Sequence, residues 1–160
     1  MADNRYVMIN STGNFGSSGT SGAAGSSGTS GVGGGSVDLS TDDIKYTGTA
    51  GETLVVGDVC YYKSDSKFWK ANASAEATTK GFLLMANSGI TADASGEFLR
   101  MGKMTTTGIV AGTEYYLSTT TGEYTDTKPI LSGEFVRIIG YGLTTTILMF
   151  DPSQDYIELL

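Results

Sequence analysis

Histidine is absent from the 160 residues of this sequence, cysteine occurs once and proline only twice. Without imidazole the chain lacks the most common general base, the most common zinc ligand and every catalytic triad that uses histidine. The single cysteine, Cys60, cannot close a disulfide within the chain, and its place in an apolar, aromatic run predicts a small buried side chain. These absences argue against an enzyme.

Positive charge and long apolar runs are also scarce. Ten basic residues stand against 17 acidic ones, for a net charge of -7, whereas proteins that bind phosphate backbones or anionic membranes gather Lys and Arg. No apolar run approaches the length of a transmembrane helix, and the patch after residues 1–5 is too short for a signal peptide. We therefore expect no nucleic-acid partner, no membrane insertion, and synthesis in the cytoplasm.

Glycine recurs at every third position near the amino end. The eight positions in phase are Gly13, Gly16, Gly19, Gly22, Gly25, Gly28, Gly31 and Gly34. A polyproline-type helix places every third residue on one edge, and only glycine fits there when three chains meet at an axis. We interpret residues 13–36 as a three-chain stem. A single-chain strap ordered against a partner and a loose Gly/Ser linker are the alternatives.

The remaining triplet positions hold mostly Ser, Thr and Ala, without proline. Proline normally reduces the entropic cost of this extended helix, so the stem should need trimerisation by a flanking domain. Residues 1–12 precede it and contain a short strand-like patch, which we interpret as an anchor that binds another protein. The anchor residues are Arg5, Tyr6, Val7, Met8 and Ile9.

The rest of the chain predicts an all-β domain at residues 53–160, joined to the stem by a connector at residues 37–52. Short β-rich runs alternate with turn residues, and residues 71–79 are the only plausible helical turn. The expected strands are 53–56, 59–63, 67–70, 81–86, 97–101, 106–109, 114–118, 135–139, 142–150 and 156–159. A small barrel or sandwich would protect the edges of so many short strands.

A faint internal duplication at a spacing of 55 residues suggests that this domain consists of two similar halves. The matching pairs are Val55 and Val110, Gly57 and Gly112, Tyr61 and Tyr116, and Trp69 and Tyr124. Each copy contains a glycine turn followed by an aromatic strand, a polar turn and a second aromatic residue.

Aromatic side chains are the one enrichment in this domain that could mark recognition. In adjacent pairs such as Tyr61-Tyr62 and Tyr115-Tyr116, strand alternation directs one ring inward and the other outward. We expect the outward rings to contact neighbouring subunits or to stack on a glycan, and we favour the subunit interface. The candidates are Tyr62, Trp69, Tyr115, Tyr124 and Tyr141.

Acidic pairs give no comparable signal. Asp42-Asp43 follows the stem and is typical of a capped turn, and Asp151 and Asp155 bracket a second expected turn. Calcium binding is a weaker interpretation of both pairs. No nucleophile motif or phosphate loop is present. The sequence therefore predicts no catalytic residue, no metal and no cofactor.

Residues 50–59, 61–66, 69–71, 112–118 and 139–142 together resemble a β-module of phage virion proteins. Such modules occur at the carboxyl ends of phage fibre, head-fibre and capsid-decoration proteins, often behind Gly/Ser/Thr triplet stems such as residues 16–31. The resemblance covers most of residues 50–158. It implies a trimeric, non-catalytic component of the virion.

We therefore expect a homotrimer on the surface of a phage particle, either a head fibre or a capsid-decoration protein, which could also adhere to hosts or surfaces. Residues 1–12 would bind a capsid or other virion protein. Three alternatives are open: a tail or baseplate fibre tip that binds a host receptor or glycan, a glycan-degrading enzyme of the tailspike kind, and a bacterial surface or spore-coat filament.

Overall fold

The computed structural model describes residues 44–160, which belong to the second of two compact units of the chain. The predicted anchor and stem, including the eight glycines and residues Arg5 to Ile9, lie outside the described residues. So do residues 37–43 of the predicted connector and the acidic pair Asp42-Asp43. The fold below is that of the described residues alone.

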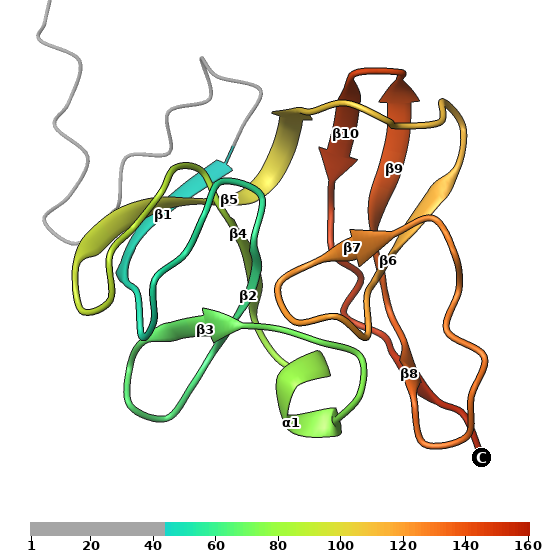
Figure 1. The fold of residues 1–160 in the computed structure, drawn as a ribbon, viewed down its shortest axis with the longest axis horizontal. Helices are drawn as coiled ribbons and strands as arrows, with labels where there is room; N and C mark the ends of the chain where they lie inside the picture. Colours follow the sequence, from blue (N-terminus) through green and yellow to red (C-terminus); the bar gives the residue numbers. More distant parts are fainter. Residues whose placement is uncertain (1–43) are drawn as a thin grey trace, which may run out of the picture. The chain divides into compact units, whose positions relative to one another are not determined.

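The described residues are mostly β, which confirms the all-β prediction. An antiparallel sheet follows the strand order β3-β2-β4-β5-β10-β9-β6-β7 and curls into a half-barrel, with β1 paired to β5 beside this path (Figure 1). Strands β8 and β11 form a separate small sheet. The strands are β1 (Ile44–Thr49), β2 (Val59–Tyr62), β3 (Phe68–Lys70), β4 (Leu83–Ala86), β5 (Ser95–Thr105), β6 (Glu114–Leu117), β7 (Tyr124–Thr125), β8 (Phe135–Val136), β9 (Ile138–Thr144), β10 (Ile147–Phe150) and β11 (Ile157–Glu158). The only helix among these residues is α1 (Glu76–Thr79).

Most expected strands overlap an observed one, but several expectations need correction. The expected strand 142–150 is a hairpin instead, formed by the end of β9 and by β10 with a turn at residues 145–146. Residues 53–56 contribute only an isolated bridge from Leu54 to Ile90, and residues 106–109 follow the end of β5 without forming a strand. Strand β1 lies inside the segment that we interpreted as a connector. It pairs with β5 over its whole length, so the β-domain begins before residue 53.

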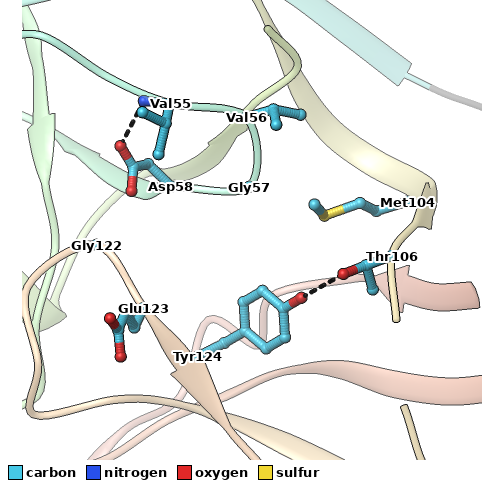
Figure 2. A pocket seen from close by; sticks show the side chains of 9 residues that line it. All are labelled: Val55, Val56, Gly57, Asp58, Met104, Thr106, Gly122, Glu123 and Tyr124. Atoms are coloured by element: carbon cyan, nitrogen blue, oxygen red, sulfur yellow. Dashed lines mark hydrogen bonds between the residues drawn. The ribbon is translucent and has the colours of Figure 1, made fainter. Parts of the chain in front are cut away.

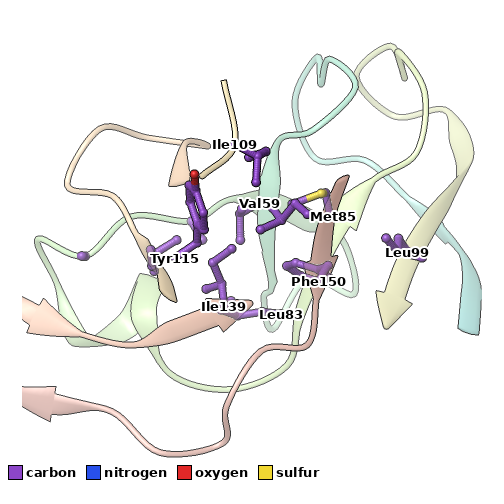
Figure 3. Close-up of a cluster of buried hydrophobic side chains, with 12 residues drawn as sticks. Val59, Leu83, Met85, Leu99, Ile109, Tyr115, Ile139 and Phe150 are labelled. Atoms are coloured by element: carbon purple, nitrogen blue, oxygen red, sulfur yellow. The ribbon is translucent and has the colours of Figure 1, made fainter. Parts of the chain in front are cut away.

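Strands β3, β2 and β4 form one arm of the curled sheet, strands β10, β9, β6 and β7 form the other, and β5 links them. The main core lies where these two arms face each other. Val59, Leu83 and Met85 from one arm meet Tyr115 and Ile139 from the other (Figure 3). The cluster also contains Leu117, Leu148 and Phe150, all fully buried. A second core lies on the opposite face of the first arm and contains Cys60, Leu84 and Phe98. Strand β4 is buried on both faces because its alternating side chains enter the two cores.

The hydrogen bonds around Gly57 recur around Gly112, at the spacing of 55 that the sequence indicated. Both glycines have positive φ, 91° and 80°, and each occupies the third position of a tight turn that requires this conformation. Within each turn, Asp58 N–H donates to Val55 O (3.2 Å) and Thr113 N–H donates to Val110 O (3.3 Å). From each turn to a neighbouring strand, Gly57 N–H donates to Ala86 O (2.9 Å) and Gly112 N–H donates to Gly142 O (2.8 Å). Local geometry therefore follows the sequence repeat.

The buried face does not follow this repeat. Val59 is fully buried in the main core, whereas its counterpart Glu114 is exposed. The strand that links the arms explains the change: Leu99 and Met104 of β5 both face the main core although they are five residues apart. Strict alternation would place these two side chains on opposite faces of the strand. Gly102, which lies between them, has a φ of 145°, and at this residue β5 stops pairing with β1 and begins to pair with β10.

Cys60 is buried, as its sequence context predicted. Desolvation, with a further contribution from Asp58, raises the pKa of its thiol, so little nucleophilic thiolate forms at neutral pH. We expect the Cys60 thiol to be unreactive toward Ellman's reagent in the native protein, and one thiol per chain to react in the denatured protein. Rapid reaction of the native protein would contradict this burial.

Candidate functional site

Two of the five aromatic candidates lie on the surface, but they are not together. Tyr62 at the end of β2 is 45% exposed, and Tyr141 in β9 is 43% exposed. The two strands belong to different arms of the sheet. They therefore do not form one recognition site within a chain.

Tyr115 is not an outward residue, and the prediction for it is wrong. Its ring is 3% exposed, packs edge-on against Tyr124 at 5.9 Å, and its hydroxyl accepts the N–H of Val110 at 2.9 Å. Tyr116 is the outward member of the pair, and its hydroxyl donates to Glu114 at 2.6 Å. Tyr115 and Leu117 lie on the face of β6 that is buried in the main core, and Tyr116 between them lies on the other face.

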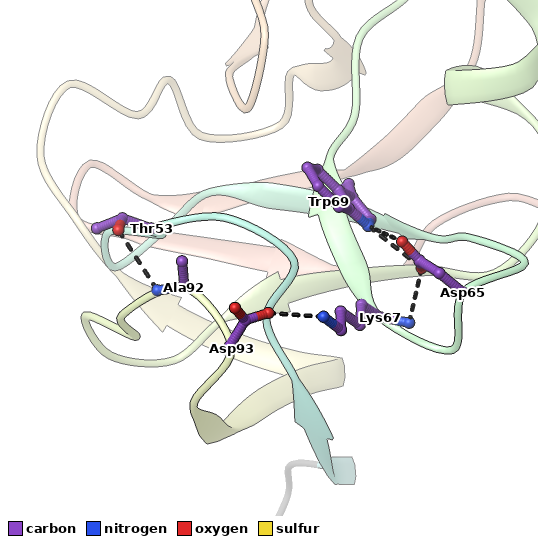
Figure 4. Close-up of polar contacts among 6 residues, drawn as sticks. All are labelled: Thr53, Asp65, Lys67, Trp69, Ala92 and Asp93. Carbon is purple, nitrogen blue, oxygen red and sulfur yellow. Dashed lines mark hydrogen bonds and ion pairs between the residues drawn. The ribbon is translucent and has the colours of Figure 1, made fainter.

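Trp69 is half-buried and its ring is already occupied by its own chain. Its Nε1 donates to the Asp65 carboxylate at 3.0 Å, as Figure 4 shows, and the Lys63 ammonium lies 4.5 Å from the ring centroid. The backbone of Gly51 also covers the indole, because a Cβ there would lie 2.6 Å from Trp69 Cδ2. We interpret Trp69 as a structural residue that fixes the β2–β3 hairpin.

Tyr124 packs against the main core and lines an open pocket of about 410 Å³. Its hydroxyl donates to Thr106 at 3.4 Å across the pocket from the exposed side chains of Val55 and Val56 (Figure 2). Two carboxylates line the pocket, those of Asp58 and Glu123. Asp58 is already paired: it accepts the Val55 N–H at 2.7 Å and the Lys70 ammonium at 3.0 Å. Its Oδ2 thus closes the turn and holds the Lys70 ammonium.

A third group of aromatic side chains forms the most extensive exposed ring cluster among the described residues. We call Tyr46, Tyr62 and Phe82 the aromatic face; they are 44%, 45% and 38% exposed. All three rings pack on buried Phe68, with centroids 5.6, 5.0 and 6.3 Å from it. Phe68 in turn packs on buried Phe98 at 4.7 Å. The exposed rings are therefore held on a rigid aromatic base.

Strand pairing places these rings on one side of the sheet. Tyr46 of β1 lies opposite Phe98 of β5, and Tyr62 of β2 lies opposite Phe68 of β3. Gly48 provides the space for Phe68, because a Cβ at this position would lie 2.6 Å from Phe68 Cε2. Sequence reasoning identified Tyr62 but missed Tyr46, which belongs to the supposed connector, and Phe82. The strand-like sequence of residues 44–49 was the signal that could have revealed β1.

Arg100 borders the aromatic face. Its guanidinium carbon lies 5.1 Å from the Phe82 ring centroid, within the range of a cation–π contact. Its Nη1 is buried and has no hydrogen-bond partner among the described residues.

Arg137 is a second arginine in an unusual setting. It is 1% exposed, and its guanidinium donates to three backbone carbonyls: Ser153 O at 2.9 Å, Gly81 O at 2.9 Å, and Thr79 O. Desolvation, with the nearby positive charge of Arg100, lowers the pKa of Arg137 to about 10, so it is still charged at neutral pH. It ties the end of α1 and the start of β4 to the carboxyl-terminal segment, which is a structural function.

Among residues 44–160 there is no group of three or more side chains suited to hold a metal ion. Asp151 and Asp155 thus form no such group with their described neighbours. No helix in this part of the chain has the length and apolarity needed to cross a membrane. No protein-family model matches the sequence, and a search of curated proteins finds no match.

Proposed function

We propose that this chain is a structural protein of a phage particle, displayed on the particle surface as a homotrimer and acting as a head fibre or capsid-decoration protein. The observation that carries the proposal is the unbroken glycine phase from Gly13 to Gly34, since a three-chain axis demands glycine at every third position. Residues 1–12 are the proposed attachment segment for a capsid or other virion protein. The mechanism is multivalent: three weak anchors act together and three β-domains are displayed.

The β-domain supports this proposal as a display and assembly module. Its described surface presents a rigid aromatic face, which is typical of protein contacts. In the pocket beside Tyr124, the Asp58 carboxylate is engaged in internal bonds. We therefore propose an adhesive or structural function instead of catalysis.

Solution mass tests the trimer directly. We expect the full chain to sediment at about 50 kDa, three times its 16.7 kDa, at micromolar concentration. A variant that lacks residues 1–36 should also be trimeric if the β-domain drives assembly, because the proline-free stem is weak alone. A monomeric full chain would refute the proposal, and a monomeric deletion variant would assign trimerisation to the stem.

A tail or baseplate fibre tip that binds a host receptor or glycan is the second candidate function. Exposed Tyr62 and Tyr141 favour it, because tyrosine rings stack on sugars as well as on protein. A glycan array probed with the full chain distinguishes the two functions. Binding that is lost in a Tyr62→Ser or Tyr141→Ser variant would favour the fibre tip.

A further inference from the structure

We infer that the pocket beside Tyr124 binds an ammonium group carried on an apolar stem, the chemistry of a lysine side chain or of a free alkylamine. Three segments of the β-domain line this pocket of about 410 Å³: residues 55–58 before β2, residues 104 and 106 at the end of β5, and residues 122–124 at the start of β7 (Figure 2). Its volume lies within the range of about 300–1,000 Å³ that is usual for ligand sites. The site lies within one chain, so the inference goes beyond the proposed function and does not depend on the number of subunits.

Two tight turns form fixed walls of the pocket. Residues 55–58 form one turn and residues 120–123 form the other, and each turn is closed by its own backbone hydrogen bond of 3.2 Å. Val59 N–H also donates to Gly122 O at 2.8 Å, which holds the two turns together. The pocket therefore exists before a ligand enters, and this reduces the entropic cost of binding.

Two glycines keep the walls of the pocket apart. A Cβ on Gly57 would lie 2.7 Å from Met104 Cε, and a Cβ on Gly122 would lie 2.8 Å from Asp58 Oδ1. Both distances are shorter than a normal contact, so a larger residue at either position would push against the neighbouring wall. The open space thus depends on the residues that form the two turns.

The charge of the pocket favours a cation. Asp58 and Glu123 supply two carboxylates and Lys70 supplies one ammonium group, 3.0 Å from Asp58 Oδ2, so these three charges leave one negative charge. That charge belongs to Glu123, whose exposed side chain makes no hydrogen bond or ion pair with the other described residues. The contact of Lys70 with Asp58 shows that one wall already holds an ammonium group of the chain itself.

The apolar part of the pocket suits the stem of such a cation. Val55 and Val56 are 57% and 61% exposed, and the ring of Tyr124 lies across the pocket from them (Figure 2). Methylene groups gain free energy by contact with apolar side chains, and an ammonium group near the ring gains a cation–π attraction. Lysine combines both parts, because its ammonium stands on a flexible four-carbon stem. An anion would be repelled by Glu123, and a purely apolar ligand would leave its carboxylate unpaired.

The test is a titration of the isotope-labelled full chain, followed by NMR, with three probes. N-acetyl-lysine methylamide presents the side chain as a protein would, n-butylamine presents the stem and cation alone, and N-acetyl-norleucine methylamide presents the stem without the charge. The lysine amide should shift the amide signals of Gly57, Thr106 and Gly122, with a dissociation constant on the order of 1 mM. The norleucine amide should bind about tenfold more weakly, because it cannot pair with Glu123.

Substitutions at two exposed positions test the walls without disturbing the core. Glu123→Gln removes the unpaired charge and should weaken binding of the lysine amide about tenfold, and Val56→Ser removes apolar contact and should weaken it about threefold. Glu158→Gln is the matched control, because Glu158 is also an exposed glutamate but lies on β11, outside the residues that line the pocket. This control removes the same charge from the chain and should leave the affinity unchanged.

Each outcome decides between specific alternatives. Binding of both charged probes supports a lysine of another protein as the source of the ammonium group, and binding of n-butylamine alone supports a free amine. The inference is overturned if neither charged probe shifts these signals, if the norleucine amide binds as tightly as the lysine amide, or if Glu123→Gln binds as tightly as Glu158→Gln. Shifts caused by N-acetylglucosamine and by none of the amines would identify a glycan site and also overturn it. The solution mass tests the trimer separately, so either proposal can fail without the other.

Discussion

Gly142→Ala is expected to lower the unfolding free energy of the β-domain by about 3 kcal/mol, which corresponds to a fall in melting temperature of roughly 10 °C. The reason is steric. A Cβ on Gly142 would overlap the carbonyl oxygen of Val110, and it would lie 2.9 Å from the side chain of Ile109. The backbones cannot separate freely, because Gly142 is bonded on both sides, to Gly112 N–H at 2.8 Å and to Thr113 O at 2.9 Å.

Thermal and urea denaturation followed by circular dichroism measures this effect. Gly89→Ala is the matched control, because its nearest neighbour, Leu54 O, is 3.8 Å from the added Cβ and the backbone there needs no glycine conformation. The control should change stability by less than about 0.5 kcal/mol. Equal midpoints for the two variants would show that the close approach of Gly142 to Val110 is not a constraint.

Arg137→Met is the other substitution with a large expected effect, and it should lower the unfolding free energy of the β-domain by about 3 kcal/mol or more. Methionine fills much of the space of the arginine stem, but the carbonyls of Thr79, Gly81 and Ser153 lose their donor. Buried acceptors without a partner carry a full desolvation penalty. Arg137→Lys should also destabilise the domain, because one ammonium group on an unbranched chain cannot reproduce the planar arrangement of three donors.

The same denaturation measurements apply, with Lys80→Met as the control for removal of a positive charge. Lys80 pairs with Glu76 at 3.5 Å on the surface, and about half of each side chain is exposed. Such pairs contribute little, so the control should change stability by less than about 1 kcal/mol. If Arg137→Met proved as stable as this control, the three carbonyl contacts would have no energetic importance.

These two predictions concern residues that the sequence did not distinguish. Arg137 stands within an expected strand and its burial depends on carbonyls from residues 79, 81 and 153, which only the folded chain brings together. Gly142 was part of an expected strand, and its contact with Val110 arises across two non-adjacent segments. Sequence patterns report local preference, and neither contact is local.

The sequence by itself determined the β class, the burial of Cys60 and the tight turns at Gly57 and Gly112, because alternation, apolar context and glycine conformation are properties of a few neighbouring residues. It also indicated the spacing of 55 at which the hydrogen bonds recur. Only the tertiary structure decided which face of each arm is buried. The change of phase near Gly102 reverses the roles of Tyr115 and Tyr116, because alternation defines two faces of a strand and long-range packing selects one.

The aromatic face was also decided by the tertiary structure. Tyr46, Tyr62 and Phe82 come from three separate segments, and their meeting depends on β1 joining β5 and on Phe68 filling the space left by Gly48. The sequence shows these aromatic residues and the strand preference of the segments that contain them. The pairing of strands distant along the chain made them one surface, since non-local hydrogen bonds and packing, which local patterns do not encode, set the order of strands in a sheet.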